Sequence, residues 1–184
     1  PTPSMRAEIK LDLAEILIAK DYIWDASLLA SQVDKDFKND ILGSKAKFLN
    51  ARISYYSGDF EWAQAQLDIL KGSTSKLISN DSMELSLLIS DNLNLDTILD
   101  PMIMFSRADL KSIQRDYKSA TATLDSIISE YPGHSLKDGI LMLELPLIHF
   151  LRCRRPTLPK STWSPMSAIK KYLTAQLLYV IPRT

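Results

Sequence analysis

The chain has 184 residues, of which 46% are apolar and 24% charged, and its mean hydropathy is close to zero. This composition is typical of one soluble globular domain and argues against a disordered or membrane-spanning chain. The single cysteine, Cys153, excludes an intrachain disulfide, and with two histidines it is too little for a structural zinc site. Basic and acidic residues both number 22, so the total charge indicates no polyanionic partner.

Residues 1–144 carry apolar side chains with a period near 3.6 and lack proline between Pro3 and Pro101, which predicts a series of helices. Helices are expected over residues 5–20, 23–37, 44–57, 59–70, 80–92, 100–114 and 116–130. No strand of convincing length is predicted. The fold class is therefore all-α, an α-α superhelix of antiparallel helical hairpins.

Local signals set the expected helix boundaries. Gly43 is expected to separate the second and third helices, and Gly72 to end the fourth in a left-handed conformation. Residues 80–82, Asn-Asp-Ser, are expected to cap the fifth helix, and Asp100 to cap the sixth ahead of Pro101. In the first two helices the expected apolar stripes are Ile9, Leu13, Ile16 and Leu17, and Trp24, Leu28, Val33 and Phe37.

The hairpins contain an internal repeat. When the three hairpins are aligned, an alanine occupies the same position of each first helix, at Ala14, Ala51 and Ala108. Twelve residues later an alanine again occupies the same position of each second helix, at Ala26, Ala63 and Ala120. The positions Ile23, Phe60 and Tyr117 also coincide, as do Ala30, Leu67 and Leu124, and Val33, Leu70 and Ile127. The first two repeats lie 37 residues apart and the next two 57 apart, which leaves room for an extra helix.

This pattern resembles the tetratricopeptide repeat (TPR), with a small residue in its first helix, a Gly-Asp-aromatic turn and an alanine in its second helix. The resemblance covers about residues 5–144, with repeats at about 5–38, 44–75 and 101–134 and an extra helix at about 80–92. The phrase Tyr131-Pro132-Gly133-His134-Ser135 is similar to the ending of repeats in bacterial cell-envelope TPR proteins. The resemblance therefore favours the bacterial cell envelope or periplasm over the cytoplasm.

TPR arrays usually bind a peptide or a partner protein on the concave face formed by their first helices. The resemblance places seven residues on that face, Phe48, Arg52, Tyr55, Tyr56, Met102, Phe105 and Asp109. Aromatic residues beside an arginine are typical of interface hot spots. An equally weighted alternative is that Phe48 and the two tyrosines only pack between repeats. Trp24 and Trp62 follow the hairpin turns and are expected to be structural.

Catalytic motifs are absent from the sequence: it has no phosphate loop, no H-E-x-x-H, no G-x-S-x-G and no nucleotide fingerprint. His149 and Cys153 lie four residues apart, which would place them on one face if this stretch were a helix. The favoured interpretation is that both simply pack in an apolar stretch, since no acid lies nearby in the sequence to orient the histidine. His134 lies in a turn and is expected to cap or to face solvent. We therefore expect a non-catalytic protein with no cofactor and no metal.

All 22 acidic residues lie in residues 1–144, whereas residues 145–184 carry seven basic residues and no acid. The formal charges of the two parts are −7 and +7. One interpretation is a capping helix over about residues 165–181. A second is a basic tail that binds a membrane or nucleic acid, and a third is a change of reading frame after Glu144.

The sequence therefore favours a protein–protein interaction scaffold that uses a TPR groove. The alternative is a membrane- or nucleic-acid-associated adaptor that uses the basic tail. Exposed repeat ends would also allow copies of the chain to associate, and binding of nucleic acid is not favoured.

Overall fold

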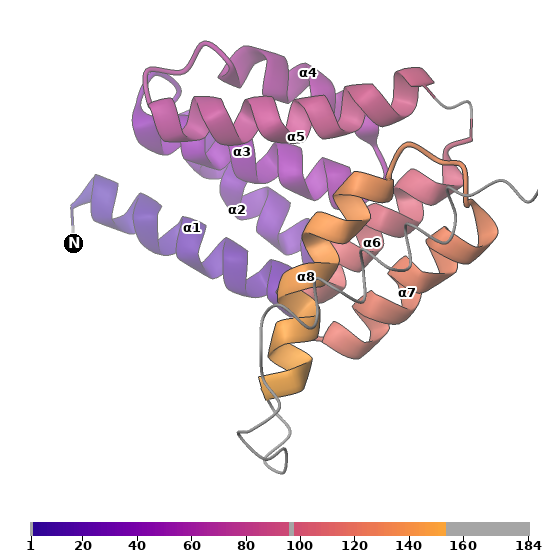
Figure 1. Ribbon diagram of the computed structural model, residues 1–184. Coiled ribbons are helices and arrows are strands. Elements are labelled where there is room, and N and C mark those ends of the chain that lie inside the picture. Colours follow the sequence, from indigo (N-terminus) through magenta and orange to yellow (C-terminus); the bar gives the residue numbers. More distant parts are fainter. Residues whose placement is uncertain (1, 96–97, 154–184) are drawn as a thin grey trace, which may run out of the picture. The chain divides into compact units, whose positions relative to one another are not determined.

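The computed structural model describes residues 2–95 and 98–153, and the regular structure in these residues is entirely helical (Figure 1). Its eight helices are α1 (Pro3–Ala19), α2 (Ile23–Asp36), α3 (Ile41–Tyr56), α4 (Phe60–Leu70), α5 (Lys76–Leu95), α6 (Asp100–Ile113), α7 (Tyr117–Glu130) and α8 (Lys137–Cys153). Apart from the last two residues of α8, they lie in the first of two units, Pro1–Leu151 and Arg152–Thr184. Consecutive helices pack on each other, which confirms an all-α fold with an α-α superhelical arrangement.

Three hairpins, α1/α2, α3/α4 and α6/α7, turn in the same way. One residue in each turn has a left-handed φ, 71° at Asp21, 83° at Gly58 and 61° at Arg115. The next residue donates its backbone N–H to the carbonyl five residues earlier, at 2.9 Å for Tyr22 to Leu17, 2.9 Å for Asp59 to Ser54 and 3.0 Å for Asp116 to Lys111. This bond belongs to the Schellman motif, which ends a helix by satisfying its last carbonyls. The three turns lie 37 and 57 residues apart, the spacing of the aligned alanines.

The six aligned alanines are all completely buried, as are Ala30, Leu67 and Leu124, which share another position of the repeat. A side chain as small as alanine lets two helix axes approach closely, and a larger one would overlap the facing helix. The core of each hairpin therefore follows from the repeated residues.

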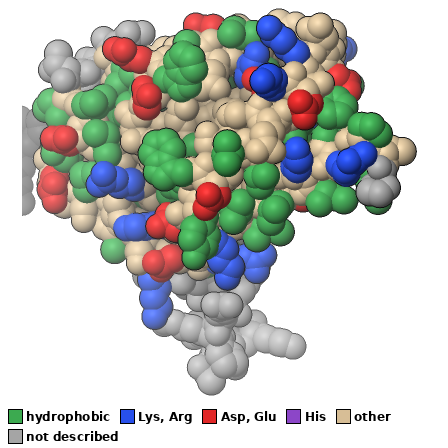
Figure 2. Space-filling view, turned by 180° about the vertical axis from the view of Figure 1, so that it is seen from behind, with side chains coloured by type: hydrophobic (Ala, Val, Ile, Leu, Met, Phe, Trp, Pro, Cys, Tyr) green, Lys and Arg blue, Asp and Glu red, His purple; other side chains and the backbone are tan. Residues whose placement is uncertain are grey.

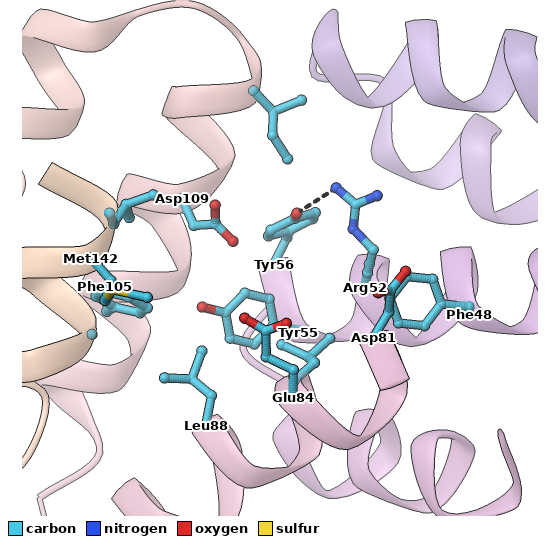
Figure 3. A pocket seen from close by; sticks show the side chains of 14 residues that line it. Phe48, Arg52, Tyr55, Tyr56, Asp81, Glu84, Leu88, Phe105, Asp109 and Met142 are labelled. Carbon is cyan, nitrogen blue, oxygen red and sulfur yellow. Dashed lines mark hydrogen bonds between the residues drawn. The ribbon is translucent and has the colours of Figure 1, made fainter. Parts of the chain in front are cut away.

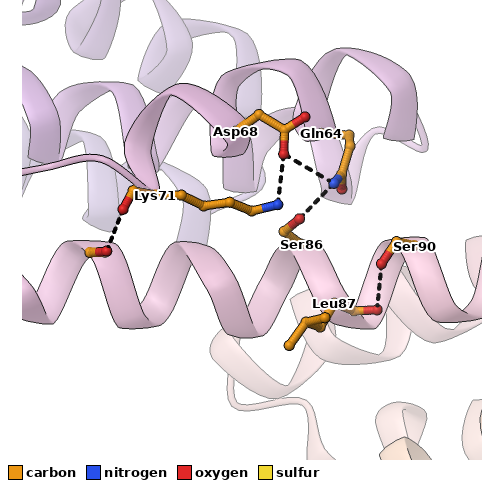
Figure 4. A network of polar contacts seen from close by, with 7 residues as sticks. Gln64, Asp68, Lys71, Ser86, Leu87 and Ser90 are labelled. Atoms are coloured by element: carbon orange, nitrogen blue, oxygen red, sulfur yellow. Dashed lines mark hydrogen bonds and ion pairs between the residues drawn. The ribbon is translucent and has the colours of Figure 1, made fainter.

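Helix α5 packs on α4 and α3. Polar contacts hold it beside α4: Gln64 donates to the Ser86 hydroxyl, and the Ser79 hydroxyl donates to the Lys71 carbonyl at 2.7 Å (Figure 4). Lys71 also pairs with Asp68 one turn earlier, at 2.7 Å. The extra helix expected at 80–92 is thus present, with longer bounds.

The sequence did not predict α8 over its full length. In the turn before it, His134 is 8% exposed and its ring Nδ1 accepts the Leu136 backbone N–H at 3.2 Å. The ring of His134 is thus buried rather than solvent-facing, and because this bond lies before the first residue of α8, the capping role stays a prediction. The helix crosses position 144, and Leu147 is only 2% exposed. The boundary expected after Glu144 therefore lies inside a helix, and the beginning of the acid-free stretch belongs to the core. The helix expected at 165–181 lies outside the described residues.

Several expected boundaries are wrong. Helix α3 begins at Ile41, whose backbone N–H is accepted by Asp40 at 2.6 Å, so Gly43 lies within the helix. A Cβ atom at Gly43 would overlap the Phe37 carbonyl oxygen, so this glycine serves a close approach of two backbone segments.

Two further capping predictions fail in the same way. Helix α5 begins at Lys76, which puts residues 80–82 inside it, and the cap of α6 is Leu99 rather than Asp100. Gly58, and not Gly72, is the glycine of the described residues that has a left-handed φ.

The buried face of α1 is also not the expected one. Ile9, Leu13 and Ile16 are 52%, 45% and 57% exposed, and the buried residues are Ala7, Leu11, Ala14 and Ile18. The structural role expected for the two tryptophans is wrong as well, because Trp24 is 79% and Trp62 60% exposed. Exposed apolar side chains lie among charged ones over the surface, as Figure 2 shows for one face.

Candidate functional site

A groove of about 570 Å³ lies among α3, α5, α6 and α8 (Figure 3). Its lining residues are Phe48, Arg52, Tyr55 and Tyr56 of α3, Asp81, Glu84, Leu85 and Leu88 of α5, Phe105, Asp109 and Ile113 of α6, and Gly139, Met142 and Leu143 of α8. Apolar and aromatic side chains predominate, and four charged residues are set among them. This size and lining are typical of sites that bind ligands.

Six of the seven residues expected on the partner-binding face line this groove. The seventh, Met102, is buried in the core and does not line the groove. The repeat explains why these predictions agree with the structure. Arg52 and Asp109 occupy the same position of the repeat, in α3 and α6, and these two first helices contact each other.

The sequence left open whether the tyrosines of α3 pack in the core or face a binding groove, and in the structure they do both. Tyr55 and Tyr56 are only 1% and 6% exposed, and the Tyr55 ring packs 5.3 Å from that of Tyr56 and 5.9 Å from that of Phe60, between centroids. Their rings therefore belong to the core. Both residues nevertheless line the groove (Figure 3).

Arg52 is held against Tyr56. Its guanidinium donates to the Tyr56 hydroxyl at 3.0 Å and lies 5.7 Å from the centre of the ring, one turn along α3. Such a contact combines a charge-assisted hydrogen bond with a cation–π interaction. Neither of the two ion pairs found in the described residues includes Arg52 or an acid of the groove.

Asp109 has no positive partner at ion-pair distance among the described residues. Burial raises the pKa of its carboxyl to about 6, although the positive charge of Arg52 lowers it in part. Burial, with the Asp109 charge, also raises the pKa of Tyr56 to about 12 and that of Tyr55 well above its ordinary value. Both hydroxyls therefore stay protonated at neutral pH.

The Tyr55 hydroxyl is buried and has no hydrogen-bond partner among the described residues. Figure 3 shows it on the side of the ring that faces Asp109 and Leu88. Burying a hydroxyl without a hydrogen bond costs about 1–3 kcal/mol by mutational measurements. The Tyr55 hydroxyl and the Asp109 carboxyl thus both lie in the groove lining without a polar partner among the described residues.

Sequence reasoning missed the residues that α5 and α8 contribute. On α5 they are Asp81, Glu84, Leu85 and Leu88, whose spacing of three and four places them on one helix face. That spacing was the available signal, but the expectation of a cap at 80–82 hid it. On α8, Gly139 lies 3.5 Å from Leu88 and Phe105, measured from an ideal Cβ, so this helix approaches both α5 and α6.

The sequence also singled out two residues at the end of the chain's described part. His149 and Cys153 lie on α8, but their side chains are outside the description. In the part of the chain that the structure describes, no three His, Cys, Asp or Glu side chains are grouped so as to hold a metal ion. Within the same residues, none of the helices has the length and apolar character needed to cross a membrane.

No protein-family model, curated protein or solved structure matches this chain.

Proposed function

We propose that this protein is a non-catalytic interaction scaffold of TPR type that binds a segment of a partner protein in the groove among α3, α5, α6 and α8. One observation carries the proposal: six residues chosen on the expected binding face line a single groove. The TPR assignment itself is supported by three hairpins with the same Schellman turn and the same buried alanines.

The chemistry of the groove supports binding rather than catalysis. Its lining offers aromatic rings, aliphatic side chains and one arginine, which are the groups that dominate binding energy at protein interfaces. The lining holds three carboxylates and two tyrosines, but among the described residues it has no serine, threonine, cysteine or lysine nucleophile and no histidine base. The bacterial cell-envelope setting belongs to the same proposal and depends on the resemblance of residues 131–135 alone.

The test uses random linear peptides displayed on phage and selected on the immobilised full chain. We expect Arg52→Ala to change the affinity of the selected peptides, because it removes the arginine of the groove lining, while Arg107→Ala, at an exposed arginine of α6 outside that lining, leaves affinity unchanged. Circular dichroism checks that both variants stay helical. Selection of no peptide, or equal affinity of the wild type and Arg52→Ala, would contradict the proposal.

The adaptor alternative depends on residues 145–184, most of which the structure does not describe, and no observation on the described residues favours it. The same peptides separate the two ideas. Binding that depends on phosphate contacts weakens steeply with salt, whereas an apolar groove responds little.

A further inference from the structure

The charges of the groove are unbalanced. Among the described residues that line it are three acids, Asp81, Glu84 and Asp109, and one base, Arg52. The guanidinium of Arg52 is already engaged with Tyr56, and a further acid, Glu15 of α1, also acts on its charge. The groove therefore presents a net negative field to an incoming group.

The polar groups of the groove that most need a partner are the Asp109 carboxyl and the Tyr55 hydroxyl. The carboxyl of Asp109 is half-buried and the Tyr55 hydroxyl is fully buried, and among the described residues the first has no ion-pair partner and the second no hydrogen bond. Tyr55 comes from α3 and Asp109 from α6, so two helices bring these oxygens to one place (Figure 3). A group with several N–H donors and a positive charge would meet both demands at once.

The surroundings fit a cation that is carried on an apolar stem. Aromatic rings of Phe48 and Phe105 and aliphatic side chains of Leu85 and Leu88 line the same groove. Such walls accept the methylene stem of a long basic side chain, and ring faces attract its charged end.

We propose that the groove binds a peptide segment through a lysine or arginine side chain flanked by apolar residues, with the charged end placed between the Asp109 carboxylate and the Tyr55 hydroxyl. This inference rests on the proposed function and adds the chemistry of the partner. An acidic segment, which Arg52 alone would favour, is the competing outcome.

Binding of the cation is linked to the proton on Asp109. A cation favours the ionised carboxylate, so affinity should rise as the pH increases through the Asp109 pKa of about 6. Among the described residues, the charge of Arg52 acts on this carboxyl, and the Asp109 charge acts on Tyr55 and Tyr56 of α3. Asp81 and Glu84 of α5 line the same groove, and the described lining residues of α8 carry no charge. The described lining residues include no histidine, and Asp109 has a pKa of about 6.

The experiment reads the sequences of phage-displayed random peptides selected on the full chain and measures their affinity by fluorescence anisotropy. We expect lysine or arginine between apolar residues to be enriched, and replacement of that residue by glutamine in the peptide to weaken binding at least about tenfold. Asp109→Asn should cause a similar loss, whereas Asp25→Asn, an exposed acid on α2, should not.

Met142 gives a test that does not disturb the core, because its side chain is 74% exposed at the rim of the groove. Met142→Lys should weaken the selected peptides and Met142→Glu should retain or strengthen them. Peptides that respond to Arg52→Ala but carry no basic residue, or that Met142→Lys strengthens, would overturn this inference and leave the proposed function intact. Peptides that respond to none of the groove variants would overturn both.

Discussion

Replacing Tyr55 by phenylalanine should stabilise the protein, although replacing a buried tyrosine by phenylalanine usually lowers the free energy of unfolding. The Tyr55 side chain is 1% exposed, and its hydroxyl is buried without a hydrogen bond. Leaving such a hydroxyl unpaired costs about 1–3 kcal/mol, while the ring packing is kept in phenylalanine. We therefore expect the free energy of unfolding to rise by about 1 kcal/mol.

The adjacent residue supplies the matched control. Tyr56 is also buried, but its hydroxyl accepts a hydrogen bond from Arg52 at 3.0 Å. Tyr56→Phe removes that bond and leaves a half-buried guanidinium with one partner fewer, so it should lower the free energy of unfolding by about 1–2 kcal/mol. The two variants remove the same atom from the same residue type and should move in opposite directions.

The assay is equilibrium unfolding in urea, followed by far-ultraviolet circular dichroism. A change of midpoint at constant slope reports stability alone. Tyr55→Phe should also weaken peptides that carry a basic residue, so that stability increases while binding decreases. If Tyr55→Phe destabilised the protein as much as Tyr56→Phe, the Tyr55 hydroxyl would be satisfied in solution, and the demand assigned to it would not exist.

Three further predictions concern packing and pH. Ala63→Leu should lower the free energy of unfolding by about 1–3 kcal/mol because Ala63 is completely buried, whereas Ala65→Leu, exposed on the same helix, should not; equal values would refute the alanine crossings. Gly43→Ala should destabilise the protein strongly, because the added Cβ would overlap the backbone at the end of α2. Gly133→Ala should have no such effect, because a Cβ there meets nothing within 4 Å, and unchanged urea midpoints for both variants would refute the close approach. The raised pKa of Asp109 predicts that stability falls as pH rises from about 4 to about 6, by about 2–3 kcal/mol at most, and that Asp109→Asn flattens this dependence; an unchanged pH profile of the urea midpoint would count against it.

The hairpins were predictable because their defining requirement is local and repeated. A close helix crossing demands a small residue, and the spacing of Ala14, Ala51 and Ala108 records that demand in the sequence. All three alanines are completely buried, which is why their spacing predicted the hairpins correctly.

The same requirement explains the error on α1. Its stripe through Ile9 and Leu13 is the more hydrophobic one, and periodicity alone selects it. The buried face is instead the one that carries Ala14, the completely buried small residue of the helix crossing, together with Ala7, Leu11 and Ile18. Hydrophobic periodicity therefore predicted the helix but not which of its faces is buried.

The site was predictable to the extent that it follows the repeat. Arg52 and Asp109 occupy one register position and both line the groove. The contributions of α5 and α8 could not follow from the repeat, since α5 is an insertion and α8 follows the last hairpin. Met102 was misassigned because the register identifies a helix face without saying how deeply its first turn is buried.

The most direct test of the groove is the methyl NMR spectrum of the full chain with and without a selected peptide. The account predicts that methyl resonances of Leu85, Leu88 and Ile113, which line the groove, shift on binding. Those of Leu28 and Ile69, which are 61% and 65% exposed outside the groove lining, should stay in place. Shifts confined to Leu28 and Ile69, with the groove methyls unchanged, would contradict the assignment of the groove as the binding site.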